Sequence, residues 1–406
     1  MRIAVIGAGA AGLMAAGTAG SNGADVTLFE RNEKPGVKLR ITGKGRCNVT
    51  NNCTKEEFFD NVVSNPRFLY SAYSEFSCAD TMSFFVNLGG PLKTERGNRV
   101  FPVSDKAFDI ADALIRYCED GGVKIIHERV KSVSFDGGFT VLTDKEYKFD
   151  KVIIATGGLS YPRTGSTGDG YKFALSAGHN VVKTSPSLVP LICSDALCAE
   201  CQGLSLKNVT LSVYDAEKDK NVYFEQGEML FTDKGVSGPL VLSASAHMSD
   251  IKPGRYRLYI DLKPALDRQT LDKRLLRDFS ENKNRDIINS FSALLPSKLI
   301  APFIELTGIP HDKKVNSITA KERGVILELL KKLPLTVTSA APVAEAVITR
   351  GGVDTKQIEP KTMQSKIQPG LYFAGEIIDC DAYTGGFNLQ IAFCTGYAAG
   401  YHASTT

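Results

Sequence analysis

The chain has 406 residues, and at roughly 150 residues per domain this length predicts two or three domains. Hydrophobic residues make up 43% of the sequence and charged residues 23%, which is ordinary for a globular protein and excludes a disordered or fibrous chain. The 48 basic and 45 acidic residues leave a net charge of +3, so no nucleic-acid partner is expected from charge. Nine cysteines, an odd number without a secretory leader, favour reduced thiols and a cytoplasmic location.

From residue 1 to about 190, strand and helix patterns alternate, which predicts a layered α/β unit. The expected strands are 3–6, 25–29, 123–126, 140–142 and 152–155, and the expected helices begin near Ala10 and at Ser104. The apolar run 3–20 contains too many glycines and alanines for a membrane span, so no membrane segment is expected.

The rest of the chain changes its periodicity three times. Residues 191–263, with about 334–345, alternate as strands do and predict a β-rich, barrel-like substrate domain. Apolar residues at helical spacing over 264–333 predict a small helical subdomain, in which Thr319 and Glu322 form a capping box. Residues 346–406 return to strand-then-helix patterns and are expected to complete the first unit, residues 1–190.

The glycine run at residues 7–12, GAGAAG, carries the strongest chemical signal. Gly7 permits a tight turn after the first strand, Gly9 lets the backbone approach a pyrophosphate, and Gly12 lets helix and strand pack closely. The helix that begins at Ala10 and Ala11 would offer free N–H groups to the phosphates. The run therefore predicts a dinucleotide-binding site.

An acidic residue supports this interpretation. The second strand ends at Glu30 and Arg31, and Glu30 lies 18 residues beyond Gly12 (30 minus 12). At that position its carboxylate can accept hydrogen bonds from the ribose hydroxyls of an adenosine.

Two further strand ends favour FAD over NAD as the bound dinucleotide. The strand 152–155 ends in Ala155, Thr156 and Gly157, where the backbone can pass close to a cofactor, and the strand 371–374 ends in Gly375 and Glu376. Glu376 is placed to bond a ribityl hydroxyl. The last helix begins after Gly386, and its positive end could face the flavin where negative charge gathers on reduction.

Five segments together resemble one family. They are KLRITGKGRCNVTN at 38–51, ATGG at 155–158, FTDKGVSGP at 231–239, AGE at 374–376 and GFNLQ at 386–390. This set, above all GKGRCNVTN, is similar to the BaiN-like and aminoacetone-oxidase-like family of bacterial FAD-dependent oxidoreductases, over essentially the whole chain. The resemblance implies a glutathione-reductase-type Rossmann domain, discontinuous in sequence, with an inserted β-rich domain and a small helical domain.

The resemblance also implies site residues. It places Gly45 to Asn48 in a loop over the flavin or pyrophosphate, and Val130, at the end of a strand 125–130, in backbone contact with the adenine. The full set of expected FAD contacts is Gly7, Gly9, Ala10, Ala11, Gly12, Glu30, Arg31, Lys38, Gly45, Arg46, Cys47, Asn48, Val130, Ala155, Thr156, Gly157, Gly375, Glu376, Gly386, Phe387, Asn388 and Leu389.

Candidate catalytic residues follow the strand ends that should meet at the flavin. They are Tyr161, Arg163 and Tyr383, since tyrosine can donate a proton and arginine can anchor an acid; plain hydrogen bonding in the fold is the alternative for each. No metal site is expected, because Cys193, Cys198 and Cys201 lack a second CxxC or a nearby histidine. Cys47 and His247 are interpreted as packing residues.

The reaction follows from the cofactor count. Only one dinucleotide fingerprint is present, so NADH or NADPH would be a transient electron donor, or the substrate itself would reduce the flavin. The substrate classes are those that the family resemblance implies, and the first hypothesis is an ene-reductase acting on an apolar or steroid-like small molecule, such as a 3-oxo-4,6-dienoyl bile acid. An amine oxidase acting on an aminoacetone-like substrate and producing hydrogen peroxide is the second, and a flavin-dependent RNA-modifying protein the third. The oligomeric state stays open.

Overall fold

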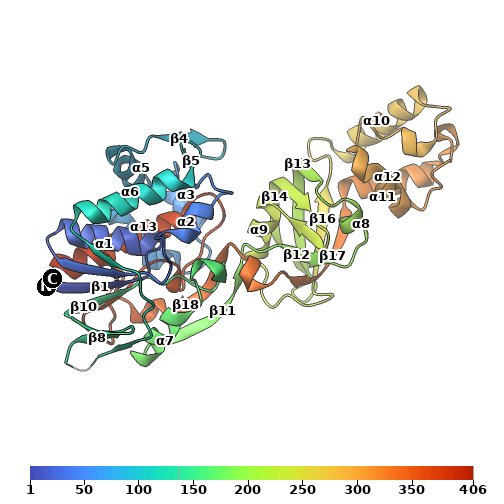
Figure 1. The fold of residues 1–406 in the computed structure, drawn as a ribbon. Helices are drawn as coiled ribbons and strands as arrows, with labels where there is room; N and C mark the ends of the chain where they lie inside the picture. Colours follow the sequence, from blue (N-terminus) through green and yellow to red (C-terminus); the bar gives the residue numbers. More distant parts are fainter. Residues whose placement is uncertain (136, 406) are drawn as a thin grey trace. The chain divides into compact units, whose positions relative to one another are not determined.

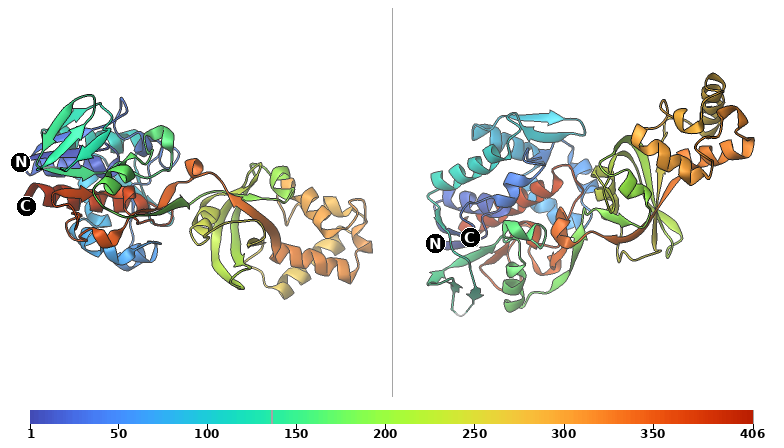
Figure 2. Two further views of the ribbon diagram at one scale, coloured as in Figure 1. Left: turned by 90° about the horizontal axis from the view of Figure 1, so that it is seen from below. Right: turned by 45° about the vertical axis from the view of Figure 1, so that its right-hand side comes forward.

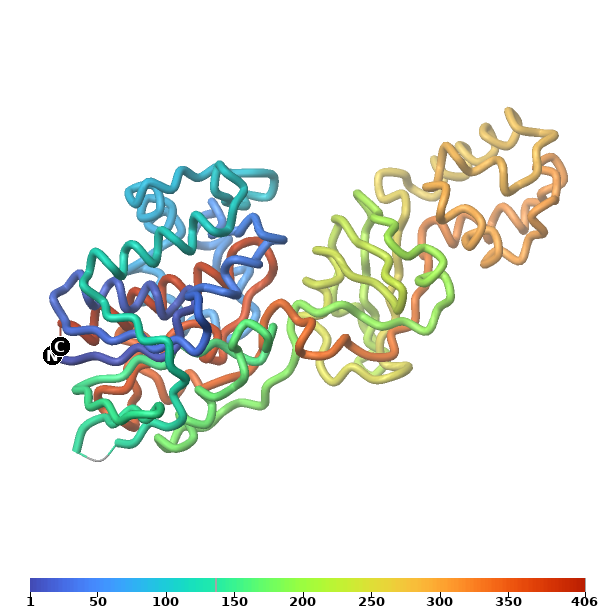
Figure 3. Tube along the Cα trace, viewed as in Figure 1, coloured from blue at the N-terminus to red at the C-terminus, as the bar shows by residue number. Residues whose placement is uncertain are grey.

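The computed structural model describes residues 1–135 and 137–405 and divides into two compact units (Figure 1). The first, the sheet unit, comprises Met1–Ser187 and Val343–Thr406. The second, the barrel unit, comprises Leu188–Pro342. The two ends of the chain lie side by side in the sheet unit (Figures 2 and 3), where Asn22 Nδ2 donates to Ser404 Oγ over 3.0 Å.

A five-stranded parallel sheet forms the centre of the sheet unit, with the order β19-β10-β1-β2-β6. The strands are β1 (Arg2–Ile6), β2 (Asp25–Phe29), β6 (Lys124–Ile126), β10 (Lys151–Ile154) and β19 (Leu371–Phe373). Their side chains are mostly buried, as expected for a parallel sheet covered on both faces. The sheet therefore joins strands from both ends of the sequence.

Helix α1 (Ala10–Ser21) packs between α6 (Ala107–Asp120) and α13 (Phe387–Thr405) (Figure 1). Small residues make the α1–α13 contact possible. A Cβ on Gly396 would lie 2.5 Å from the carbonyl oxygen of Ala11, and one on Gly400 would lie 2.3 Å from that of Ala15. Glycine at these two positions of α13 is therefore a packing requirement.

Smaller elements complete the sheet unit. A three-stranded sheet, β7 (Ser132–Ser134), β8 (Phe139–Leu142) and β9 (Glu146–Phe149), contacts the main sheet where the rings of Tyr147 and Phe149 meet Phe29. The others are α2 (Val37–Ile41), β3 (Thr50–Asn51), α3 (Lys55–Asp60), α4 (Tyr70–Glu75), α5 (Cys78–Asn87), β4 (Leu92–Glu95), β5 (Arg99–Pro102), α7 (Asp169–Ser176), β11 (Val181–Ser187) and β18 (Ile348–Val353).

The barrel unit is built around a closed six-stranded barrel of order β12-β15-β14-β13-β16-β17. Its strands are β12 (Leu191–Cys193), β13 (Ser205–Asp215), β14 (Lys220–Phe231), β15 (Gly235–Ser237), β16 (Tyr256–Asp261) and β17 (Leu333–Ala340). Leu211, Leu258 and Leu335 are fully buried in its core. The α/β fold class with an inserted barrel, expected from the sequence, is confirmed.

Most helices of the barrel unit lie between β16 and β17 in the sequence. They are α10 (Arg268–Glu281), α11 (Ser297–Thr307) and α12 (Ala320–Lys331), with α8 (Leu197–Glu200) and α9 (Pro239–Ser245) earlier in the chain. The predicted capping box before α12 is confirmed, because Thr319 and Glu322 exchange both of its hydrogen bonds. Among the described residues, no helix has the length and apolar character needed to span a membrane.

Two sequence expectations about elements are wrong in detail. The strand expected at 125–130 ends at Ile126, since the chain turns there: Glu128 N bonds back to the Ile126 carbonyl over 3.0 Å, so Val130 lies in the following connection. The helix expected from Ser104 begins at Ala107, because Ser104 Oγ accepts from the backbone N–H of Lys106 over 3.2 Å in a turn before the helix.

Candidate cofactor and active site

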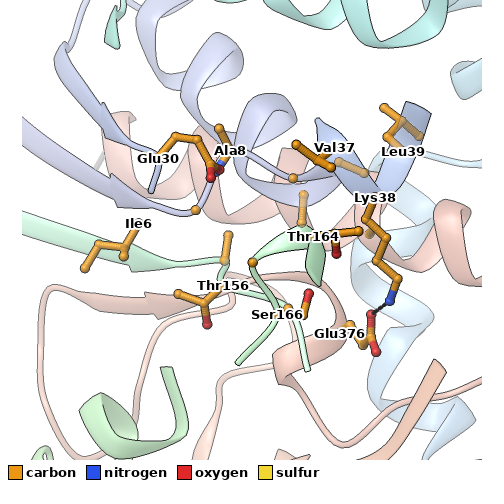
Figure 4. Close-up of a pocket in the computed structure, with 18 of the residues that line it drawn as sticks. Ile6, Ala8, Glu30, Val37, Lys38, Leu39, Thr156, Thr164, Ser166 and Glu376 are labelled. Carbon is orange, nitrogen blue, oxygen red and sulfur yellow. Dashed lines mark hydrogen bonds and ion pairs between the residues drawn. The ribbon is translucent and has the colours of Figure 1, made fainter. Parts of the chain in front are cut away.

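A cavity in the sheet unit lies at the carboxyl ends of β1, β2 and β10 (Figure 4). This edge is the usual ligand site of doubly wound parallel sheets. The cavity and its open mouth contain about 1370 Å³ of space not filled by protein atoms. That figure includes solvent at the mouth, and the residues that line the cavity extend from Ile6 to Ala392 along the chain.

The glycine loop between β1 and α1 forms one wall of the cavity. Gly7 has a φ of +100°, and a Cβ on Gly12 would lie 1.8 Å from the Gly7 carbonyl oxygen, so both positions require glycine. Gly9 differs, because a Cβ there would meet no described atom within 4 Å. Gly9 lines the cavity, so its missing side chain leaves room for a ligand.

Glu30 stands at the end of β2 on the cavity wall, but its carboxylate already has partners. Oε2 accepts from the backbone N–H of Ala8 over 2.9 Å, and Oε1 accepts from the backbone and side-chain nitrogens of Asn32 over 2.8 and 2.7 Å. A carboxylate has about four acceptor positions, so capacity for one ribose hydroxyl remains. The sequence pattern found Glu30 but gave no sign of Asn32.

The charged residues next to this end of the cavity pair with one another. Arg31 donates to Thr167 Oγ1 over 2.7 Å and lies 3.5 Å from Asp169, and Arg129 donates to Asp169 over 2.8 Å. Burial opposes the shift, but the hydrogen bond from Arg129 and the charges of Arg129, Lys172 and Arg31 lower the pKa of Asp169. Val130 follows directly and lines the cavity from the connection after β6.

A compact polar network closes the other end. Lys38 Nζ donates to Glu376 Oε2 over 2.5 Å and to Ser160 Oγ over 2.6 Å (Figure 4). Glu376 Oε1 accepts from Ser160 Oγ over 2.5 Å and from the backbone N–H of Thr349 over 2.9 Å. The sequence predicts that Glu376 bonds a ribityl hydroxyl, and in the structure its carboxylate also pairs with Lys38. Ser160 and Thr349 carried no signal in the sequence.

The start of α13 also reaches the cavity, through Asn388 and Leu389. Asn388 fixes the preceding loop: its Oδ1 accepts from Ala382 N over 2.9 Å, and its Nδ2 donates to Ala382 O over 2.7 Å and to Tyr383 O over 3.3 Å. Gly386 packs so closely that a Cβ there would lie 2.3 Å from the Thr50 carbonyl oxygen. The positive end of a 19-residue helix is thus held at the cavity wall.

The loop 45–48 points its functional groups elsewhere. Arg46 pairs with Glu95 and Asp105, both at 2.5 Å, and its guanidinium lies 4.2 Å from the ring centre of Phe101. Cys47 is fully buried and burial raises the pKa of its thiol, which fits a packing role. These residues are not among those of the described chain that line the cavity.

The predicted cofactor residues therefore separate into two groups. Those that line the cavity are Gly7, Gly9, Ala10, Ala11, Glu30, Arg31, Lys38, Val130, Ala155, Thr156, Gly157, Glu376, Asn388 and Leu389. Within the described residues, those outside the lining are Gly12, Gly45, Arg46, Cys47, Asn48, Gly375, Gly386 and Phe387.

None of the three catalytic candidates lines the cavity of the described chain. Tyr161 is half-buried next to it, with Lys38 Nζ 5.8 Å from its ring centre, and its φ of 51° is rare for a residue with a side chain. Arg163 is exposed in the 3₁₀ turn Pro162–Thr164. Tyr383 is half-buried, and its backbone N–H donates to the Asn61 carbonyl over 3.0 Å.

The residues present fit FAD. Within the described chain, Thr156 Oγ1 on the cavity wall is buried without a hydrogen-bond partner, and buried polar atoms normally have one. The other features that FAD needs are also present. Gly9 leaves open space, the start of α1 can bind the phosphates, and Glu30 can bind the ribose. The start of α13 lies at the far end of the cavity.

The barrel unit contains three cysteines that lie close together in the sequence. Cys193, Cys198 and Cys201 are all buried, and burial, with the charge of Glu200 as a smaller cause, raises the pKa of Cys201 to about 11. The described residues contain no group of three or more histidine, cysteine, aspartate and glutamate side chains placed to hold a metal ion. The ring of His247 lies 5.2 Å from that of Tyr223.

The Rossmann-type sheet, the glycine loop and the cavity define a dinucleotide-binding flavoprotein. Residues 1–402 match the family described as "HI0933-like protein Rossmann domain", and the chain belongs to this family of FAD-dependent oxidoreductases. The family membership inferred from the GKGRCNVTN segment is thereby confirmed.

Two relatives align with nearly the whole chain. The ribosomal RNA dihydrouridine synthase of Escherichia coli (strain K12) is 34% identical over 397 residues, which cover 97% of this chain and 96% of the relative. The 3-dehydro-bile acid delta(4,6)-reductase of Clostridium scindens is 30% identical over 414 residues, 99% of each protein. Among solved structures, 3-ketosteroid-delta4-(5alpha)-dehydrogenase from Rhodococcus jostii RHA1 has a TM-score of 0.55 at 14% identity, covering 100% of this chain and 96% of that one, which shows a shared fold.

Proposed function

We propose that this flavoprotein reduces a carbon–carbon double bond conjugated to a carbonyl group. The names of the two relatives carry the proposal, because both describe this chemistry on different molecules. Making dihydrouridine saturates a ring double bond of uridine next to a carbonyl, and a delta(4,6)-reductase acting on a 3-dehydro bile acid saturates double bonds conjugated to the 3-keto group. The common step adds a hydride at the β-carbon and a proton at the α-carbon.

Residues of the cavity suit the binding part of this task. The glycine loop with Glu30 would hold the adenosine and pyrophosphate, and the Lys38–Glu376 pair with the start of α13 would lie at the flavin ring. Bound FAD would supply the hydride of the reaction. The positive end of α13 would stabilise negative charge at that end of the cavity.

The proton at the α-carbon requires an acid from the chain, and we assign this role to Tyr161. Its left-handed backbone conformation is costly, and such strain is often kept where it positions a functional side chain. The neighbouring Ser160 is tied to Glu376 and Lys38, so the base of Tyr161 is fixed relative to the cavity. Tyr383 is the second candidate, and Arg163, being exposed, would anchor an acidic group of the substrate.

NADH or NADPH is the electron donor in this proposal. It would dock transiently, because the sequence holds a single GxGxxG run followed by an acidic strand end, and FAD would occupy that one site. An anaerobic stopped-flow experiment with each nicotinamide tests this step. Bleaching of the flavin absorbance by either one is expected, and failure of both would contradict the proposed donor.

Ribosomal RNA is the substrate to test first. Two relatives carry the name ribosomal RNA dihydrouridine synthase, from Escherichia coli at 34% and from Haemophilus influenzae at 30% identity, each over 97% of this chain. The net charge of +3 alone favours no RNA partner, so this assignment depends on the relatives. The second candidate is a steroid-like dienone, supported by the Clostridium scindens relative.

One assay separates the candidates. Holoenzyme reduced under argon is mixed with unmodified ribosomal RNA transcripts, with a 3-oxo-4,6-dienoyl bile acid or with a panel of small amines. Flavin reoxidation with a gain of two hydrogens in the RNA or the steroid, seen by mass spectrometry, identifies the ene-reductase substrate. Oxidised holoenzyme that instead yields hydrogen peroxide from an amine under air would replace the proposal by the amine-oxidase alternative.

A further inference from the structure

A run of basic residues follows β2 and reaches the cavity wall. Residues 31–46, RNEKPGVKLRITGKGR, contain six lysines and arginines and one acid, although the whole chain has 48 basic and 45 acidic residues. The run includes α2, whose residues Val37, Lys38 and Leu39 line the cavity (Figure 4). Basic residues are thus concentrated at the edge of the candidate active site.

Two large apolar side chains lie exposed beside this run. Phe108, in the first turn of α6, is 54% exposed, and Ile41, the last residue of α2, is 47% exposed. The two helices are neighbours (Figure 1), and the backbone N–H of Ala107 donates to the Gly45 carbonyl over 2.8 Å. The exposed residues at this junction, which we call the α2–α6 patch, are Ile41, Lys44, Lys106 and Phe108.

Arg40 holds the ring of Phe108 in place. Its guanidinium lies 4.9 Å from the ring centre, a distance typical of a cation–π contact. The guanidinium is itself fixed, because Nη2 donates to Asp112 over 2.7 Å and Nε donates to the Pro35 carbonyl over 3.2 Å. An exposed aromatic ring with such a support can stack on a nucleic-acid base and lose little side-chain freedom on binding.

The patch also carries positive charge that no acid of the described chain neutralises. Lys44 and Lys106 are exposed and form no ion pair within the described residues, whereas the neighbouring Arg46 pairs with Glu95 and Asp105. Cationic side chains beside an exposed aromatic ring are the combination with which proteins hold single-stranded nucleic acid. A steroid-like dienone has neither phosphates nor neighbouring bases, so the patch favours RNA among the two substrate candidates.

We infer that the α2–α6 patch binds the single-stranded ribosomal RNA that flanks the uridine to be reduced, an inference that rests on the RNA substrate of the proposed function. An enzyme that acts on a base must take it out of its stack, so the uridine enters the cavity alone. The five residues of α2 join the cavity lining to the patch, so the adjoining strand continues over the patch. Phe108 stacks on a neighbouring base, and Lys44 and Lys106 bind phosphates.

The test measures RNA affinity without turnover. The oxidised, FAD-loaded full chain is titrated into labelled, overlapping fragments of unmodified ribosomal RNA, free of protein, and the fragment bound most tightly is studied at several salt concentrations. Phe108→Ala should raise the Kd for this fragment at least about fivefold, as expected for the loss of one stacked base. Lys44→Ala should raise the Kd and reduce the slope of log Kd against log salt by about 1, as expected for the loss of one phosphate contact.

Two matched variants are the controls: Phe224→Ala, at a phenylalanine of the barrel unit that is 75% exposed, and Lys148→Ala, at an exposed lysine of β9. Both should leave the Kd unchanged. Tight RNA binding that neither Phe108→Ala nor Lys44→Ala weakens would overturn the inference and leave RNA as the substrate. Weaker binding of these variants to intact ribosomal subunits alone would assign the patch to a ribosomal protein and also overturn it. A chain that binds no fragment yet reduces the steroid dienone would remove the inference together with the RNA substrate, but not the ene-reductase.

Discussion

The ammonium group of Lys38 lies 2.5 Å from the carboxylate of Glu376, although the two residues are 338 positions apart in the sequence. Ser160 joins both, so α2, the segment after β10 and the segment after β19 meet in one polar network at the cavity wall. The pair thereby ties the first part of the sheet unit to the last.

Replacing Lys38 with methionine should weaken this junction. Losing one partner of a buried ion pair costs about 3–5 kcal/mol. The side chains here are 25% and 12% exposed, so solvent screening reduces the expected loss for the FAD-free protein to about 1–2 kcal/mol. Thermal unfolding of the FAD-free protein measures the loss, and fluorescence titration should show weaker FAD binding. Lys34→Met, at an exposed position four residues earlier, is the control and should change neither quantity.

The glycine loop allows a test that separates folding from cofactor binding. Gly9→Ala introduces a Cβ that meets no described atom within 4 Å, so thermal unfolding of the FAD-free protein should be nearly unchanged. The same Cβ would enter the space we assign to the pyrophosphate, so the Kd for FAD should rise by at least about tenfold, or about 1.4 kcal/mol. Unchanged FAD affinity would contradict that assignment.

Gly12→Ala is the matched variant at the next glycine of the motif. Its Cβ would lie 1.8 Å from the Gly7 carbonyl oxygen, so the backbone of the loop must shift. Overpacking of this kind costs about 1–3 kcal/mol or more. We expect a lower melting temperature even without FAD, which distinguishes Gly12 as a packing residue from Gly9 as a ligand-facing one.

Tyr161→Phe tests the assigned proton donor. Proton transfer by a positioned side chain typically contributes about 10²–10⁴-fold in rate. Reoxidation of the reduced flavin by the substrate should slow by this factor in stopped-flow experiments, while reduction by NADH or NADPH proceeds as in the unchanged enzyme. Tyr383→Phe is measured in parallel, and a loss confined to that variant would transfer the role to Tyr383.

The capping box of α12 predicts a pH dependence of stability. Glu322 accepts hydrogen bonds from Lys313 over 2.6 Å and from the backbone of Thr319 over 2.8 Å, and these bonds, Lys313 first, lower its pKa to about 2. The unfolded chain has the ordinary glutamate pKa of about 4.3. Stability from Glu322 is therefore complete above that value and is lost as the pH falls towards 2.

Glu322→Gln should lower the free energy of unfolding by about 0.5–1 kcal/mol at pH 7, because glutamine can still accept the capping bond but carries no charge to pair with Lys313. The difference from the unchanged protein should shrink between pH 5 and about 3, where Glu322 begins to be protonated in the unfolded chain. Urea unfolding at several pH values measures this difference in the free energy of unfolding. Glu281→Gln, at an exposed position, is the control. A difference that stays constant down to pH 3 would contradict the assigned pKa.

Local spacing was enough to predict the elements that depend on neighbouring residues. The glycine loop, the start of α1 and the capping box at Thr319 and Glu322 each need only a few consecutive positions, because turns, helix starts and caps are set by local backbone geometry. The GKGRCNVTN segment likewise led to the family. The strand that the resemblance implied as far as Val130 ends at Ile126 instead, because where a strand ends depends on the neighbour it pairs with, and β6 pairs with β2 only that far.

The sequence by itself determined a layered α/β unit with a dinucleotide-binding glycine loop and an inserted β-rich segment, since hydrophobic periodicity and glycine spacing are local, and the resemblance carried by GKGRCNVTN added the FAD family. Only the tertiary structure decided the partners of charged side chains: Glu376 with Lys38, Glu30 with the backbone N–H of Ala8, and Arg46 with Glu95. Such partners are chosen by proximity after distant segments have packed, and a charge in a sequence carries no sign of what will lie beside it.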